Sequence, residues 1–152
     1  LGSDVPVCVA SAPSWMEGRG EIVTPLEFLP RLSLLLVNPG VAVPTKNVFA
    51  ALAQRSGATM DLRNTKPHTI DDLLAFLGQT SNDLEAPAIE IQPVIGKVLA
   101  ALRTLPGALF ARMSGSGATC FAIFPDDERA ADAASVLRAA HDGWWIQPAS
   151  TQ

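Results

Sequence analysis

Two serines and two glycines, Ser114, Gly115, Ser116 and Gly117, form a turn (the SGSG turn) with the residue types that can hold an anion. Glycine has no Cβ, so backbone N–H groups in such a turn can come close to a ligand or to another loop. Two hydroxyl groups beside those amides could face the same anion. The flanking segments 108–113 and 118–124 are apolar and predict two strands, so a plain hairpin turn also explains the run. No Lys-Ser/Thr pair follows the glycines, which excludes a Walker A loop.

Asp4 is the second residue whose type could do chemistry, because a carboxylate can accept the proton of an attacking hydroxyl group. It precedes Val5 and Pro6. On local sequence alone, an aspartate in this position is typical of a turn or a cap. Lys46 could attract a diphosphate, although an exposed lysine is usually only a solvated charge.

The bulk composition narrows the class of protein. Of the 152 residues, 48% are hydrophobic and 17% are charged, and the formal net charge is −4. This composition favours a packed core over disorder and offers no basic surface for nucleic acid. The longest apolar run, residues 32–37, is far shorter than the roughly 18 residues that span a bilayer. Since no secretory signal is seen either, we expect a cytoplasmic protein with no membrane or nucleic-acid partner.

Cysteine usage agrees with a reducing compartment. Cys8 and Cys120 lie far apart in apolar segments, which predicts two reduced thiols in the core. His68 and His141 share no short metal-ligand spacing with the cysteines, so no metal site is predicted.

In the first half of the chain, apolar patterning predicts strands at residues 5–11, 15–17, 21–26 and 31–37. The last of these ends at the Asn-Pro-Gly run 38–40. We expect Thr45 to cap a short helix that reaches about residue 53, followed by a loop over 54–68. Thr69 and Asp72 resemble a capping box for the next helix.

In the second half, Asn82 or Asp83 is expected to cap a helix that breaks near residues 91–92. Pro93 lacks an N–H group but suits the first position of a second helix, which should run to about residue 104. After the two strands around the SGSG turn, Asp126 should cap a helix that ends before Gly143, and residues 144–146 form a last strand. From residue 31 onward, this order predicts an α+β fold: a ferredoxin-like split βαβ with an antiparallel four-stranded sheet.

Five sequence blocks together carry a family resemblance. They are LGSDVPVC at 1–8, EGRGE at 17–21, VNPGVAVPTKNVF at 37–49, SNDLE at 81–85 and MSGSG at 113–117. In this order they closely resemble the C-terminal half of kinases of the GHMP superfamily. Within it they are most similar to the kinases that act on 4-diphosphocytidyl-2-C-methyl-D-erythritol. Each block alone is modestly specific, whereas five in the family's order are highly specific, and they cover the chain to about residue 146.

The resemblance implies an ATP-dependent kinase that uses Mg²⁺ and phosphorylates the 2-hydroxyl of 4-diphosphocytidyl-2-C-methyl-D-erythritol in the non-mevalonate isoprenoid pathway. It assigns residues 1–30 to a remnant of the kinase N-terminal domain and residues 31–152 to the C-terminal domain. The chain does not begin with Met, and Leu1 falls inside a family block, so we expect a fragment. The family's Gly-Gly-Ser-Ser phosphate loop, adenine-site residues and partner lysine have no counterpart here. The fragment alone is therefore expected to be inactive.

The resemblance also implies site residues. Asp4 matches the family's active-site aspartate, proposed to accept the proton of the attacking hydroxyl; Ser3 stands where the family usually has Ala. Thr45 and Phe49 match positions that line the substrate cleft. Phe49 could contact the cytidine or methylerythritol moiety, or it could instead anchor the short helix in the core.

The SGSG turn matches the family's third motif, a turn that packs beside the phosphate loop and helps to form the catalytic pocket. Arg19 stands where the family often has an aliphatic residue, so no role is carried over to it. Two other functions stay open. One is another GHMP small-molecule kinase, less favoured because the block around residues 38–45 looks particular to the erythritol kinases. The other is a non-catalytic, ferredoxin-like ligand-binding or assembly module.

Overall fold

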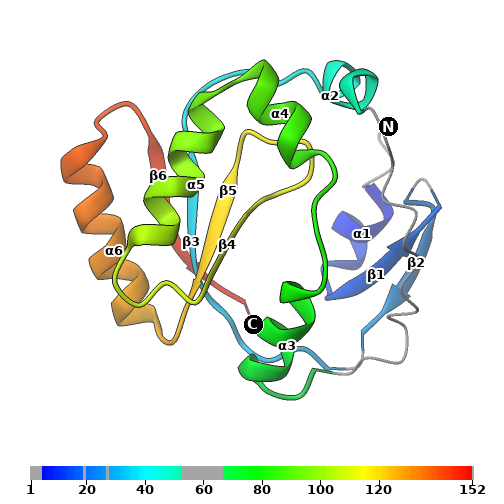
Figure 1. Ribbon diagram of the computed structural model, residues 1–152. Helices are drawn as coiled ribbons and strands as arrows, with labels where there is room; N and C mark the ends of the chain where they lie inside the picture. The colour runs from blue at the N-terminus through cyan, green and yellow to red at the C-terminus, as the bar shows by residue number, and fades with distance from the viewer. Residues whose placement is uncertain (1–4, 19, 27, 53–66, 152) are drawn as a thin grey trace. The chain divides into compact units, whose positions relative to one another are not determined.

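A computed structural model of the chain describes residues 5–18, 20–26, 28–52 and 67–151 (Figure 1). The chain divides into two compact units. The first comprises Leu1–Pro30 and Met60–Leu77, and the second comprises Arg31–Thr59 and Gly78–Gln152. Across the described ranges, no helix has both the length and the apolar character needed to cross a membrane.

The first unit contains a two-stranded antiparallel sheet and two helices. Strands β1 (Ser14–Glu17) and β2 (Ile22–Pro25) pair as a hairpin, close to the two strands predicted for this segment. Helix α3 (Ile70–Gly78) starts with the predicted capping box. The Asp72 N–H donates to Thr69 Oγ1 over 3.1 Å, and the Thr69 N–H donates to Asp72 Oδ2 over 3.0 Å. Hydrogen bonds to the Asp72 carboxyl from the Thr69 side chain, and then from the Thr69 N–H, lower the pKa of that carboxyl.

The segment predicted as a strand at residues 5–11 is instead helix α1 (Val5–Ala10). The Ser11 N–H donates to the Val7 carbonyl over 3.0 Å. Donor and acceptor are four residues apart, as in the hydrogen bonds of an α-helix. Pro6 fits because the first turn of a helix does not need its N–H group.

The prediction of two core thiols is wrong for Cys8, which is exposed on α1, and confirmed for Cys120. Burial raises the pKa of the Cys120 thiol to about 12.

The second unit holds a four-stranded antiparallel sheet in the order β4-β5-β3-β6. Its strands are β3 (Ser33–Asn38), β4 (Phe110–Met113), β5 (Cys120–Phe124) and β6 (Trp145–Ser150). Its helices are α2 (Thr45–Ala51), α4 (Glu85–Ile91), α5 (Val94–Thr104) and α6 (Asp127–Ala140). The predicted α+β, ferredoxin-like sheet is confirmed. The predicted loop at 54–68 lies outside the described residues except for its last two positions.

Helices α5 and α6 cover one face of this sheet (Figure 1). Along β3, Ser33, Leu35 and Val37 are buried while the intervening residues are half-buried, as period-two alternation requires. The side chains that meet them come from both helices and from β5. They include Ile95, Val98, Leu99 and Leu102 on α5, Ala130, Ala133, Ala134 and Leu137 on α6, and Cys120, Ala122 and Phe124 on β5. The alanine stripe on α6 lets this helix pack closely on the sheet.

Most of the predicted helix boundaries of the second unit are confirmed. Gln92 ends α4 and Pro93 precedes α5, so the helix breaks where the proline predicts it. The Asp126 side chain accepts a hydrogen bond from the Arg129 N–H over 2.7 Å and thus caps α6. The last strand is longer than predicted, because β6 continues through Pro148. It lies at the edge of the sheet, where a proline can be accommodated.

Candidate functional site

The SGSG turn joins β4 to β5 as a hairpin closed by two backbone hydrogen bonds. The Ser114 N–H donates to the Thr119 carbonyl over 2.9 Å, and the Gly117 N–H donates to the Ser114 carbonyl over 3.0 Å. Gly115 and Gly117 have φ angles of +54° and +88°. Glycine adopts this region at low cost, so the hairpin itself accounts for both glycines.

One side of the turn is open. A Cβ added to Gly115 would meet nothing within 4 Å. Among the described residues, the N–H groups of Gly115 and Ser116 have no hydrogen-bond acceptor. Two amide donors and the serine hydroxyls therefore lie together on one short loop. This donor set fits the oxygen atoms of a phosphate group.

Asn82 connects the start of α4 to the turn. Its Nδ2 donates to the Met113 carbonyl over 3.0 Å and to the Gly115 carbonyl over 2.8 Å. Its Oδ1 accepts a hydrogen bond from the Leu84 N–H over 3.0 Å. The prediction that Asn82 or Asp83 caps the helix is wrong: Leu84 occupies the N-cap position of α4, and no side-chain cap hydrogen bond forms there. The contacts with the turn were not predicted, because they join residues more than thirty positions apart.

Thr45 and Ser116 are brought together by the fold. Their hydroxyl oxygens lie 2.9 Å apart in a hydrogen bond between the first residue of α2 and the SGSG turn. The expectation that Thr45 caps α2 is wrong: Pro44 precedes the helix, and no side-chain cap forms there. The Thr45 hydroxyl group is instead engaged with Ser116.

Asn38, from the third sequence block, reaches the far end of the same hairpin. Its Nδ2 donates to Thr119 Oγ1 over 2.9 Å, and its Oδ1 accepts from the Gly40 N–H over 2.8 Å. The blocks around residues 38–45, 82–85 and 113–117 therefore meet at one end of the sheet, although they are well separated in sequence.

An open pocket of about 610 Å³ lies beside the turn. Its wall includes Phe49 and Leu52 from the α2 segment, residues 81–84 before α4, and Arg112 to Gly115, with Phe121. Phe49 is 52% exposed, whereas its neighbour Val48 is fully buried. Val48 is thus the core anchor of α2, and the Phe49 ring is available to a ligand.

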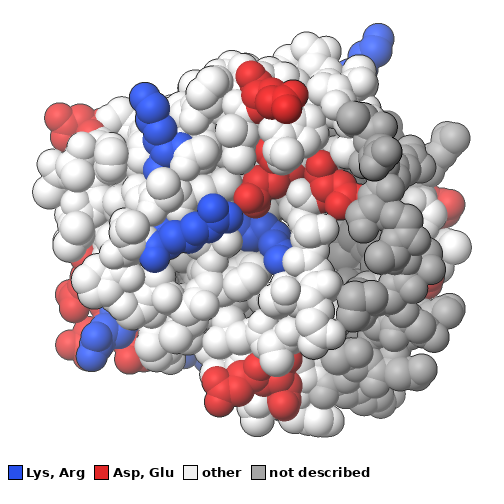
Figure 2. Space-filling view, in the orientation of Figure 1, with Lys and Arg blue, Asp and Glu red and all other residues white. Residues whose placement is uncertain are grey.

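Arg112 adds a positive charge to the pocket wall. Its guanidinium group donates to Thr80 Oγ1 over 2.9 Å and to the Thr80 carbonyl over 2.5 Å, and it lies 4.7 Å from the centre of the Phe110 ring. Partial burial lowers its pKa, although arginine stays charged at any physiological pH. On the face shown in Figure 2, acidic and basic side chains are interspersed.

Two residues from the sequence prediction, Asp4 and Arg19, lie outside the described residues. Lys46 is exposed on α2. Within the described part of the chain, no group of three or more His, Cys, Asp or Glu side chains is placed to hold a metal ion.

The profile of the family described as GHMP kinases C terminal matches residues 61–143. The chain belongs to the GHMP kinase family. A relative from Cereibacter sphaeroides (strain ATCC 17025 / ATH 2.4.3), named 4-diphosphocytidyl-2-C-methyl-D-erythritol kinase, is 53% identical over 98% of this chain and 54% of its own length. A relative of the same name from Rhodopseudomonas palustris (strain HaA2) is 48% identical over 98% of this chain and 53% of its own length. This GHMP kinase chain thus spans about half the length of these relatives.

Two solved structures of kinases share the fold. A crystal structure of 4-(cytidine 5'-diphospho)-2C-methyl-D-erythritol kinase matches with a TM-score of 0.74 and 29% identity, over 97% of this chain and 53% of that one. Homoserine kinase from Cytophaga hutchinsonii matches with a TM-score of 0.64 and 18% identity, over 91% of this chain and 47% of that one. The second likeness, at this low identity, concerns the fold alone.

Proposed function

We propose that this chain is the C-terminal half of an ATP-dependent kinase that phosphorylates the 2-hydroxyl group of 4-diphosphocytidyl-2-C-methyl-D-erythritol. The observation that carries the proposal is 53% identity, over 98% of the chain, to a relative with that name. The geometry supports it, since an open loop with phosphate-compatible donors lies beside a pocket that presents an aromatic ring.

In this proposal, residues 1–30 belong to the N-terminal domain of the kinase and residues 31–152 form its C-terminal domain. The partner is the small-molecule substrate, and the reaction takes place in the cytoplasm as part of isoprenoid synthesis. Neither nucleic acid nor a membrane takes part.

Each site residue has a proposed role. Asp4 accepts the proton of the substrate hydroxyl as that oxygen attacks the γ-phosphate. Phe49 presents its ring to the cytidine or methylerythritol moiety, and Thr45 lines the same cleft. Within the SGSG turn, Ser114 to Gly117, the N–H groups of Gly115 and Ser116 and the serine hydroxyls orient phosphate oxygens.

ATP with Mg²⁺, when bound, supplies the phosphoryl group and neutralises its charge. The donors of the turn fit the phosphates, and the metal ion would be held mainly by those phosphates and by residues outside the described part of this chain. The described residues contribute positioning, which in phosphoryl transfer accounts for much of the rate.

The experiment is an ATP-turnover assay of the full-length protein with the cytidyl substrate, with homoserine and mevalonate as competing substrates. We expect turnover with the cytidyl substrate alone. The Asp4→Asn variant should lower kcat by about 10²-fold or more, with a smaller change in KM, because the amide keeps the shape and loses the basicity. Turnover with a competing substrate would refute the proposed specificity. The absence of any turnover would favour a non-catalytic module, and a normal kcat in Asp4→Asn would make Asp4 structural.

A further inference from the structure

Strand β4 is an edge strand, and its last residue has backbone groups that face away from the sheet. Ser114 donates to Thr119 across the hairpin. In an antiparallel pair, successive residues point their N–H and C=O groups to opposite sides, so those of Met113 point outward. Glu85 Oε2 accepts from the Met113 N–H over 3.1 Å, and Asn82 Nδ2 donates to the Met113 carbonyl. Two side chains at the start of α4 therefore take the place of a neighbouring strand.

Asn82 does more than satisfy this edge. The same Nδ2 also donates to the Gly115 carbonyl over 2.8 Å, two residues further along and inside the turn. Gly115 has a φ of +54°, in the left-handed region. The carboxamide thus ties the fixed end of β4 to a residue inside the turn.

Only a neutral amide satisfies all three contacts. Asparagine has two N–H donors and one carbonyl acceptor, which match two backbone carbonyls and the Leu84 N–H. A carboxylate of the same shape could still accept from Leu84, but it would place a negative charge against two carbonyl oxygens. The Leu84 N–H requires only the acceptor, so one donated hydrogen bond holds the end of β4 and the other holds the turn.

The turn is held from its other side by Thr45. The Ser116 hydroxyl bonds to Thr45 at the start of α2, the helix that carries Phe49. Asn82, in the segment before α4, and Thr45, at the start of α2, therefore fix consecutive residues of the turn, Gly115 and Ser116.

We propose that Asn82 is a positioning residue: its carboxamide sets the conformation of the SGSG turn, so that the turn donors are aligned with the transferring phosphoryl group. The catalytic part of this inference rests on the proposed function. Because Asn82 acts through the turn, replacing it should change kcat more than the KM of the cytidyl substrate.

The test compares Asn82→Asp and Asn82→Ser in the full-length protein. Both keep an oxygen that can accept from the Leu84 N–H, and both lose the bridging amide. Gln147→Glu is the matched control, since it makes the same amide-to-acid change at an exposed position of β6. Amide hydrogen exchange of Gly117 is measured with kcat and KM for each variant.

We expect both Asn82 variants to accelerate Gly117 exchange and to lower kcat by about ten-fold or more, with KM for the cytidyl substrate within about three-fold of wild type. Gln147→Glu should change neither. Unchanged Gly117 exchange, or an unchanged kcat for the folded enzyme despite a lower melting temperature, would overturn the inference. If the wild-type protein has no kinase activity, the proposed function fails, while the exchange measurement still decides whether Asn82 holds the turn.

Discussion

Gly115 and Gly117 share a positive φ, but a side chain would meet different surroundings at the two positions. At Gly115 the space beyond the Cβ position is empty to 4 Å. At Gly117 a Cβ would lie 2.9 Å from Met113 Sδ and 3.4 Å from Ile95 Cδ1. Both neighbours are buried, so neither can move away without disturbing the core. The second glycine of the turn is therefore the more constrained of the pair.

At the residue scale, we expect Gly117→Ala to lower the free energy of unfolding by about 2 kcal/mol and Gly115→Ala to lower it by about 1 kcal/mol. Both variants place a side chain on a residue with positive φ, which is unfavourable, and only Gly117→Ala also crowds the core. Gly117→Val should be worse, while Ser114→Ala, which removes only a hydroxyl, should be milder. Urea unfolding of the four variants measures the order. Equal losses for the two alanine variants would show that the contact with Met113 carries no cost.

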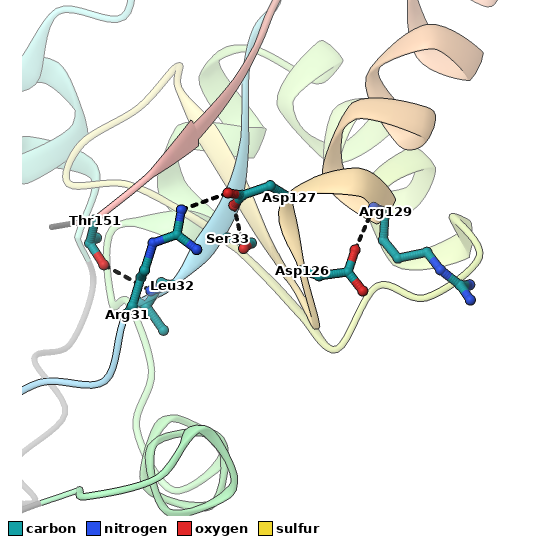
Figure 3. A network of polar contacts seen from close by, with 7 residues as sticks. All are labelled: Arg31, Leu32, Ser33, Asp126, Asp127, Arg129 and Thr151. Carbon is teal, nitrogen blue, oxygen red and sulfur yellow. Dashed lines mark hydrogen bonds and ion pairs between the residues drawn. The ribbon is translucent and has the colours of Figure 1, made fainter.

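At the scale of the element, the first turn of α6 is tied to the start of β3 (Figure 3). Asp127 Oδ1 accepts from the Ser33 hydroxyl over 2.6 Å, and Oδ2 pairs with the Arg31 guanidinium over 2.6 Å. Next to this contact, the Leu32 N–H donates to Thr151 Oγ1 over 2.8 Å, beyond the end of β6. The hydrogen bond from Ser33, and then that from Arg31, lower the pKa of the Asp127 carboxyl.

This network predicts a pH-dependent effect of Asp127→Asn. A carboxyl with a lowered pKa in the folded state stabilises the protein above its unfolded pKa, and the stabilisation is lost as the pH falls through the folded pKa. The variant should therefore unfold at a lower urea concentration than wild type at pH 7. The difference should shrink as the pH falls below the ordinary value of 3.8. The measurement is the urea midpoint of wild type and of Asp127→Asn at pH 7, 5, 4 and 3. These pH values lie on both sides of the pKa of an aspartate in an unfolded chain, about 3.9.

Two further variants separate the contributions to this effect. Arg31 and Asp127 are both more than half exposed, so their ion pair is screened by water and salt. Ser33 is buried, and its hydrogen bond is not screened in this way. Ser33→Ala should therefore reproduce more of the Asp127→Asn effect than Arg31→Gln does. A dominant effect of Arg31→Gln that disappears in high salt would contradict this account.

The elements that the sequence predicts well are those with a local signal at their ends. Pro93 breaks a helix and Asp126 caps one within four residues of the signal, and both are confirmed. Segment 5–11 was misread because its β-branched residues favour a strand by propensity, and propensity is a weak determinant for a six-residue helix. The Asn82 contacts could not be predicted, because their partners lie on another element and only the fold brings them together.

The candidate site also combines residues that the sequence identifies with contacts that only the fold creates. The residue types of the SGSG turn single it out as a candidate site, whereas Thr45 and Phe49 are assigned to the site by the family resemblance alone. The roles of all three stay predictions. What the structure adds is the Thr45–Ser116 hydrogen bond and the exposure of Phe49. Neither has a local sequence signal, since the Phe49 position has the apolar type and spacing of a core residue.

At the scale of the whole molecule, the described residues offer a phosphate-compatible loop and an exposed aromatic ring, but phosphoryl transfer requires several groups acting at once. Positive charge and aligned donors must surround the transferring group on more than one side. The sequence contains no Gly-Gly-Ser-Ser phosphate loop, and the chain spans about half the length of its relatives.

We therefore expect the 152-residue chain by itself to show no ATP turnover with the cytidyl substrate above a buffer blank. The reason is that effective alignment of reactants can supply about 7–11 kcal/mol of barrier lowering, and a loop whose partners are absent cannot provide that alignment. A coupled assay of a preparation shown by mass spectrometry to lack longer protein measures it, with the Asp4→Asn form of the same chain as the control. Turnover well above the blank that is lost in Asp4→Asn would show that the site in this chain suffices for catalysis. Its groups would then have to complete the phosphate pocket without the family's phosphate loop.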